Sequence, residues 1–90
     1  MMLKITKARE NAGAVLLILE GKVARQWATL LDDVCRSYLQ QQKTIQLDCA
    51  HVNFIDASGV EVLCNLPCQQ VTLVSAPSFV TQLLQRGDQP

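Results

Sequence analysis

Apolar and polar positions alternate at the start of the chain and then give way to a continuous apolar run. Residues 3–6 alternate apolar and polar side chains, which predicts a strand with one solvated face. Residues 11–13 carry turn chemistry, and the apolar run from Ala14 to Leu19 predicts a second strand buried on both faces. The short Asn/Gly turn between them predicts an antiparallel hairpin, and Gly21 then allows the chain to bend away from the sheet.

The next segment changes from strand-like to helical spacing. Between Ala24 and Gln41 the apolar residues recur at intervals of three and four, which predicts a helix of roughly five turns with one apolar stripe. A third strand is predicted from Thr44 to Asp48, so strand, helix and strand form a right-handed crossover between parallel strands. The stripe consists of Trp27, Leu30, Leu31, Val34, Tyr38 and Leu39. Because Trp27 and Tyr38 lie on this apolar stripe, we expect them to pack in the core and not to form a binding platform for a ligand.

The same pattern repeats in a shorter form in the second half of the chain. The apolar pair Phe54-Ile55 leads into Asp-Ala-Ser-Gly at residues 56–59, which opens a second helix. Pro67 ends that helix near residue 66, because the residue before a proline avoids helical geometry. Residues 71–74 predict the fourth strand, and residues 75–78 begin a last helix. The apolar face and C-terminal cap of that helix are predicted at Val80, Leu83, Leu84 and Gly87.

The resulting order is β-β-α-β-α-β-α. It predicts one small α/β domain over residues 1–90, with a four-stranded mixed sheet and about three helices. A chain of this length buries roughly 60–65% of its unfolded surface, which is enough for one modest core.

Composition narrows the classes of partner. Eight Lys/Arg balance eight Asp/Glu, so no basic field recruits nucleic acid directly. The longest apolar run is far shorter than the ~20 residues that span a bilayer, so we expect no membrane insertion. The first residues lack the apolar region of a signal peptide, which favours a cytoplasmic protein.

The cysteines and the single histidine do not form a recognisable site. Cys64 and Cys68 are the nearest pair, and their spacing is not the Cys-x2-Cys of common zinc sites. Cys35 and Cys64 fall on predicted apolar helix faces, where a cysteine packs as a small hydrophobic residue. The fourth cysteine of the sequence is Cys49. His51 is expected in a loop after the third strand, with no nucleophile motif and no Gly-rich phosphate loop. We therefore expect no metal, no cofactor and no enzymatic activity.

Two interpretations of Ser58 remain open from local chemistry. Ser58 suits a helix N-cap, and Glu61 three residues later completes a capping box, which contributes about 1 kcal/mol. Alternatively, a phosphate on Ser58 could sit at the helix N-terminus without unfolding it and be sensed by a partner. Gly59 would let another protein approach the backbone closely. Asp56 could cap the helix instead of Ser58, or place a carboxylate beside its hydroxyl.

The block from residue 48 to residue 63 resembles the STAS domain, the module shared by bacterial anti-sigma factor antagonists and the cytoplasmic tails of sulfate transporters. A strand ends in Asp48, Phe54-Ile55 supplies the usual hydrophobic pair, and residues 56–60 supply the Asp-x-Ser-Gly turn with an aliphatic residue behind it. Residues 19–21 before the long helix, and the strand-Pro-helix of residues 71–85, match the same pattern. The resemblance therefore covers nearly the whole chain.

The resemblance implies a protein-interaction module and two kinds of partner. In an antagonist, an anti-sigma factor of the serine-kinase type binds while Ser58 is free and is released when Ser58 is phosphorylated. In the alternative, a stand-alone STAS protein is a regulatory subunit of a lipid-transport ABC system or a stressosome-like assembly, without phosphorylation. The antagonist is the leading hypothesis. Ala57 replaces a usual hydroxyl, Glu61 replaces a usual small residue, and the helix is short, and these departures favour the alternative more than a standard antagonist sequence would. The implied partner-binding residues are Asp56, Ala57, Ser58, Gly59 and Glu61.

Overall fold

The computed structural model describes residues 3–82 and has the predicted order of elements. Residues 78–82 open a further helix after the last strand, so the fold is α/β with a four-stranded mixed sheet in the order β-β-α-β-α-β-α. The predicted apolar residues Leu83 and Leu84 and the predicted cap Gly87 lie outside the described residues. The named elements are β1 (Leu3–Glu10), β2 (Ala14–Val23), α1 (Gln26–Gln40), β3 (Thr44–Ile55), α2 (Ala57–Asn65) and β4 (Val71–Val74).

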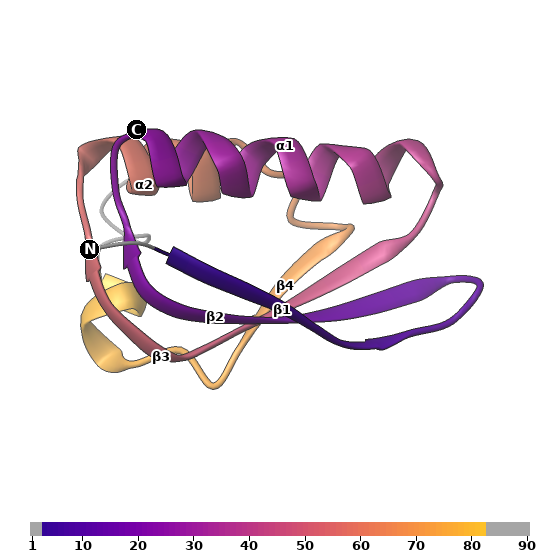
Figure 1. Cartoon of the computed structure of the whole chain (residues 1–90), viewed down its shortest axis with the longest axis horizontal. Coiled ribbons are helices and arrows are strands. Elements are labelled where there is room, and N and C mark those ends of the chain that lie inside the picture. The colour runs from indigo at the N-terminus through magenta and orange to yellow at the C-terminus, as the bar shows by residue number, and fades with distance from the viewer. Residues whose placement is uncertain (1–2, 83–90) are drawn as a thin grey trace.

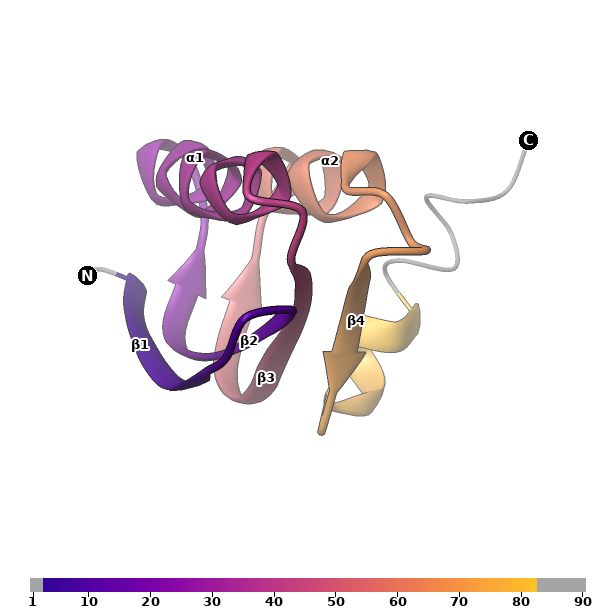
Figure 2. The same ribbon diagram turned by 90° about the vertical axis from the view of Figure 1, so that its right-hand side faces the viewer.

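The sheet keeps the strands in sequence order, β1-β2-β3-β4. The pairing of β1 with β2 is antiparallel, as the turn chemistry predicts, and β2, β3 and β4 are parallel. Successive right-handed crossovers that advance in one direction place their helices on one face of a sheet. Accordingly, α1 and α2 lie side by side over the same face (Figures 1 and 2). The helix at residues 78–82 follows β4 and lies apart from both of these helices (Figures 1 and 2).

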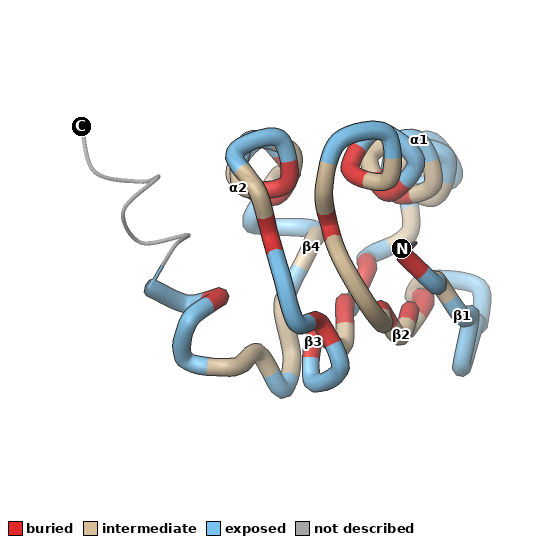
Figure 3. The backbone as a smooth tube through the Cα atoms, turned by 60° about the vertical axis from the view of Figure 1, so that its left-hand side comes forward, coloured by how far each residue is buried: buried red, intermediate tan, exposed pale blue. Residues whose placement is uncertain are grey.

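The core fills the layer between the sheet and these two helices. Every second residue points into it from Val15 to Leu19 on β2 and from Ile45 to Cys49 on β3, which gives the alternating burial in Figure 3. The register shifts between the two strands interrupt this alternation nearer their carboxyl ends. On α1 the buried positions are spaced by three and four residues, as one face of a helix requires. The most deeply buried side chains of these three elements are Val15, Leu17, Leu19, Val23, Ala28, Leu31, Cys35, Ile45, Leu47 and Cys49.

Both central strands are longer than the sequence pattern predicts. The second strand continues through Gly21 to Val23, and the third continues to Ile55. Gly21 adopts a φ of 104°, in the left-handed region, and the register shifts between Gly21 and Lys22, so the chain bends within the strand instead of leaving the sheet. His51 consequently lies in β3 opposite Glu20, and its predicted loop position is wrong.

The expected burial of the second strand on both faces is only partly correct. Leu17 and its neighbours on the helix side are buried, whereas Leu16 and Ile18 on the opposite side are half-buried. The residues beside them on that opposite face include the exposed Gln46 and Thr72, so this face is mixed in polarity.

The long helix follows the predicted stripe with one exception. It spans Gln26 to Gln40, which lies within the predicted range. Within residues 3–82, no helix is long and apolar enough to cross a membrane. Trp27 and Tyr38 are half-buried and pack against the core. Leu30, in contrast, is 41% exposed, because the buried face is centred on Ala28, Leu31 and Cys35.

Two neighbouring leucines of α1 therefore test the placement of the core. Leu31 is 0% exposed, so Leu31→Ala leaves a cavity and should lower the free energy of unfolding by about 2–4 kcal/mol. Leu30→Ala is the matched control and should change it by about 0.5 kcal/mol or less. Denaturant titration measures both variants, and equal losses would show that the helix is rotated relative to this packing.

Burial also determines the chemistry of two thiols. Desolvation raises the pKa of the Cys35 thiol to about 12 and that of the Cys49 thiol to about 11. Both are buried, whereas Cys64 is half-buried and Cys68 is exposed. Among residues 3–82, no group of three or more His, Cys, Asp and Glu side chains is arranged to hold a metal ion.

These raised pKa values predict a loss of stability at alkaline pH. An unfolded cysteine titrates near pH 8.5, so between that pH and the folded pKa the folded state binds more protons than the unfolded state. Stability should therefore fall as pH rises, by about 2 kcal/mol per buried thiol between pH 8 and pH 10. Denaturant titration with a reducing agent present measures the change. Cys35→Ala should flatten the dependence, the exposed control Cys68→Ala should not, and identical slopes would contradict the assignment.

Candidate functional site

The segment that carries Ser58 lies where the central strands end and both helices begin. Val23 ends β2 shortly before α1, and Ile55 ends β3 directly before α2. Because β2 and β3 are parallel and pair to their last residues, Val23 opposite Ile55, the two helix starts lie at the same edge of the sheet (Figure 1). The carboxyl ends of parallel strands are the usual location of binding sites in α/β folds.

Asp56 is the residue that caps α2. Its Oδ1 accepts a hydrogen bond of 2.9 Å from the backbone N–H of Gly59, three residues on, as an N-cap does. Its Oδ2 accepts a second bond of 3.1 Å from the backbone N–H of Arg25, just before α1. The Asp56 N–H in turn donates to the carbonyl of Val23 at 3.3 Å. One residue thus joins the starts of both helices to the end of β2.

Of the two caps that the sequence leaves open, Ser58 is not the one that forms. Ser58 is the second residue of α2 and is exposed, and the capping box with Glu61 is not formed. Asp56 takes the cap because it stands three residues before Gly59, whose N–H it accepts. The Ser58 hydroxyl has no hydrogen-bond partner among residues 3–82.

Gly59 serves internal packing. It is buried, and a Cβ at this position would lie 2.1 Å from the carbonyl oxygen of Val23 and 2.7 Å from Cγ2 of Ile55. The glycine therefore lets the first turn of α2 rest directly on the ends of both central strands. Of the other predicted partner-binding residues, Ala57 and Glu61 are exposed and Asp56 is half-buried. The accessible part of the predicted set is Ala57, Ser58 and Glu61.

A single added methyl group tests this packing. Gly59→Ala should lower the free energy of unfolding by about 3 kcal/mol or more, because the backbone of β2 cannot move aside without breaking the sheet. Gly13→Ala is the control, since a Cβ there meets nothing within 4 Å, and it should change stability by less than about 0.5 kcal/mol. Thermal or denaturant unfolding compares the two, and similar stabilities would contradict the close approach of α2.

A cleft lined by cations and aromatic rings lies beside this site. It has a volume of about 330 Å³, and the Nζ of Lys22 lies 5.7 Å from the centre of the Phe54 ring. We refer to it as the Lys22–Phe54 cleft, and its lining residues are Lys22, Ala24, Arg25, Gln26, Trp27 and Phe54. The sequence pattern does not identify this cleft, because Lys22 and Phe54 meet only through the parallel register of β2 and β3.

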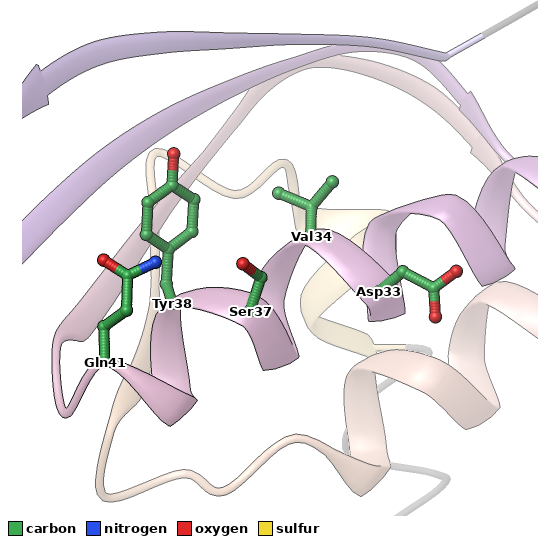
Figure 4. Close-up of a pocket in the computed structure, with 5 residues that line it drawn as sticks. All are labelled: Asp33, Val34, Ser37, Tyr38 and Gln41. Carbon is green, nitrogen blue, oxygen red and sulfur yellow. The ribbon is translucent and has the colours of Figure 1, made fainter.

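A second hollow, of about 380 Å³, runs along the other half of α1. Its side chains come from successive turns of that helix, and Figure 4 shows them as Asp33, Val34, Ser37, Tyr38 and Gln41. The Nζ of Lys43 lies 6.0 Å from the centre of the Tyr38 ring. Because these residues lie toward the C-terminal end of α1, this hollow is separate from the helix starts around Asp56.

Comparison with known proteins gives one matching family model and a similar solved structure. The family model described as "Mlab, STAS domain" matches residues 6–88. The solved structure of the anti-sigma factor antagonist SpoIIAA in its unphosphorylated form is similar, with a TM-score of 0.72 and 14% sequence identity. The match covers 91% of this chain and 82% of that one. No curated protein matches the chain in sequence.

Proposed function

The chain belongs to the STAS domain family, and from that membership we propose that it is a regulatory protein-interaction module of the cytoplasm and not an enzyme. The partner docks at the start of α2, on the accessible residues Ala57, Ser58 and Glu61. One observation carries this proposal: Ser58 is exposed at a helix start, and Asp56 already caps that helix. The serine is thus available for recognition or modification.

The favoured mechanism is a charge switch on Ser58, with a serine-kinase anti-sigma factor as the partner. A phosphate there adds a charge of about −1.5 to −2 next to the first N–H groups of α2 and the positive end of its dipole. The helix tolerates the added charge, because Asp56, not Ser58, makes the capping bond. Glu61, three residues on along the same helix, adds negative charge to the same surface. Phosphorylation therefore changes the charge that a partner meets and leaves the fold in place.

A constitutive subunit of a transport assembly is the second candidate function. The description of the matching family model as "Mlab, STAS domain" supports this candidate, since stand-alone STAS proteins also occur in lipid-transport ABC systems. Ala57 in place of a usual hydroxyl, and Glu61 in place of a usual small residue, point the same way. In this role the same surface at the start of α2 binds its partner permanently, and Ser58 is a contact residue without a phosphorylation cycle.

Two substitutions at Ser58 distinguish the functions. Because Ser58 does not cap α2, Ser58→Ala should change the free energy of unfolding by about 0.5 kcal/mol or less, and Ser58→Asp by less than about 1 kcal/mol. For a phosphorylation switch, Ser58→Ala binds the captured partner like the unmodified protein, and Ser58→Asp binds at least about tenfold more weakly. Affinity capture from the native cell, with phosphopeptide analysis of Ser58, supplies the partner and the modification state.

The matched control places the same charge elsewhere on the surface. Ser37→Asp changes an exposed serine on the other half of α1 and should leave partner affinity unchanged. If Ser58→Asp and Ser58→Ala bind equally well, the switch is wrong and the permanent subunit is favoured. A captured transporter subunit in place of a kinase would lead to the same conclusion.

A further inference from the structure

The Lys22–Phe54 cleft combines charge with exposed apolar surface. Phe54 is 46% exposed, more than Leu30 or Phe79, and it forms one wall of the cleft together with Lys22 from the neighbouring strand. The half-buried Trp27, at the start of α1, also lines the cleft. The volume of about 330 Å³ is at the low end for ligand sites and suits one or two side chains.

The positive charge of this cleft is not neutralised within the described residues. Neither Lys22 nor Arg25 makes an ion pair there, since the three ion pairs present are Lys7–Glu10, Lys43–Glu10 and Arg36–Asp32. The carboxylate of Asp56, which bonds the backbone of Arg25, accepts two backbone N–H groups and is not among the residues that line the cleft. The first turn of α1 contains no acidic residue, so the helix dipole adds to the positive potential. A protein of formal net charge +0 thus has a local cationic site.

Arg25 occupies its position at a conformational cost. Its φ of 52° lies in the left-handed region, where glycine is favoured and other residues are strained. The backbone is held there by the Asp56 carboxylate on its N–H and by the Ala28 N–H, which donates to its carbonyl at 3.0 Å. These bonds would hold a glycine equally well. A large cationic side chain is thus present where folding alone favours glycine.

We propose that the Lys22–Phe54 cleft binds an acidic segment of the protein partner, with one aspartate or glutamate next to an apolar side chain. The carboxylate pairs with Lys22 and Arg25, and the apolar side chain packs between Phe54 and Trp27. Charge complementarity identifies the occupant, because the cleft presents two unpaired cations and no carboxylate among its lining residues. This inference rests on the proposed function, since it defines the chemistry of the same partner.

The cleft and Ser58 flank the same residue. One carboxylate oxygen of Asp56 accepts a hydrogen bond from the N–H of Arg25. The other accepts one from the N–H of Gly59, the residue directly after Ser58. A phosphate on Ser58 would therefore place negative charge beside the cations that bind the acidic segment. It would compete with that segment's carboxylate, which gives the switch a physical route that needs no change of backbone conformation.

A short peptide tests the cleft directly. The probe is a pentapeptide that alternates aspartate and leucine, Asp-Leu-Asp-Leu-Asp, blocked at both ends, and its matched control replaces each aspartate with asparagine. Trp27 is the one tryptophan of the sequence and lines the cleft, so its fluorescence reports occupancy. The acidic peptide should give a saturable change, and the asparagine peptide should bind roughly threefold to tenfold more weakly, as expected for two exposed ion pairs.

Charge substitutions locate the binding. The double variant Lys22→Gln/Arg25→Gln should weaken the acidic peptide roughly threefold to tenfold and reduce its salt dependence. Lys4→Gln is the control, because Lys4 is exposed on β1 and makes no ion pair among the described residues, and it should leave affinity unchanged. Ser58→Asp should weaken the peptide, whereas Ser37→Asp should not. Circular dichroism verifies that each variant is folded.

Three results with the peptides, and a fourth with the captured partner, would overturn the inference. The first is equal binding of the two peptides, and the second is an equal loss in Lys4→Gln, which would indicate diffuse charge attraction. The third is binding of ATP or GTP that displaces the peptide and shows the same dependence on Lys22 and Arg25, which would make the cleft a nucleotide site. The captured partner separates this inference from the proposed function. If Lys22→Gln/Arg25→Gln binds that partner normally while Ser58→Asp does not, the proposed role of the cleft is contradicted and the proposed switch at Ser58 is retained.

Discussion

The carboxylate of Asp56 is the interaction on which the candidate site depends. One oxygen accepts a hydrogen bond from the N–H of Arg25, 31 residues earlier and just before α1. The other accepts one from the N–H of Gly59, 3 residues later in the first turn of α2. A carboxylate at a helix N-terminus is favoured by both the free N–H groups and the helix dipole. Here one carboxylate satisfies donors at two helix starts, which fixes the position of one helix relative to the other. The orientation of Ser58 and of the cationic cleft follows from that arrangement.

Close packing makes this arrangement rigid. Gly59 brings the first turn of α2 against the carbonyl of Val23 and the side chain of Ile55, with no space for a Cβ. The first turn therefore has little freedom to shift when a partner binds or when charge is added. In the proposed switch, a phosphate on Ser58 would then act through the electrostatic field at the surface. This is consistent with an exposed serine whose hydroxyl makes no bond within the described residues.

The sequence predicts the order and type of the elements because those depend on local periodicity. Alternation identifies β1, three- and four-residue spacing identifies α1, and Pro67 marks the end of α2. Strand ends are different, because a strand continues as long as its neighbour supplies hydrogen bonds. The parallel pairing of residues 20–23 with residues 51–55 extends both strands beyond their apolar runs. That pairing is a tertiary property, so the loop position predicted for His51 fails.

The sequence leaves the cap of α2 undecided for a related reason. Asp56 and Ser58 are both good N-caps, so local chemistry leaves two possible starts for α2. Tertiary contacts decide between them, because only a helix that begins at Ala57 places Gly59 against Val23 while Asp56 accepts the N–H of Arg25. This choice leaves the Ser58 hydroxyl without a partner in the described chain. The capping role that local chemistry offered to Ser58 belongs to Asp56, and in the folded chain Ser58 lies exposed two residues after the carboxylate that binds the N–H of Arg25.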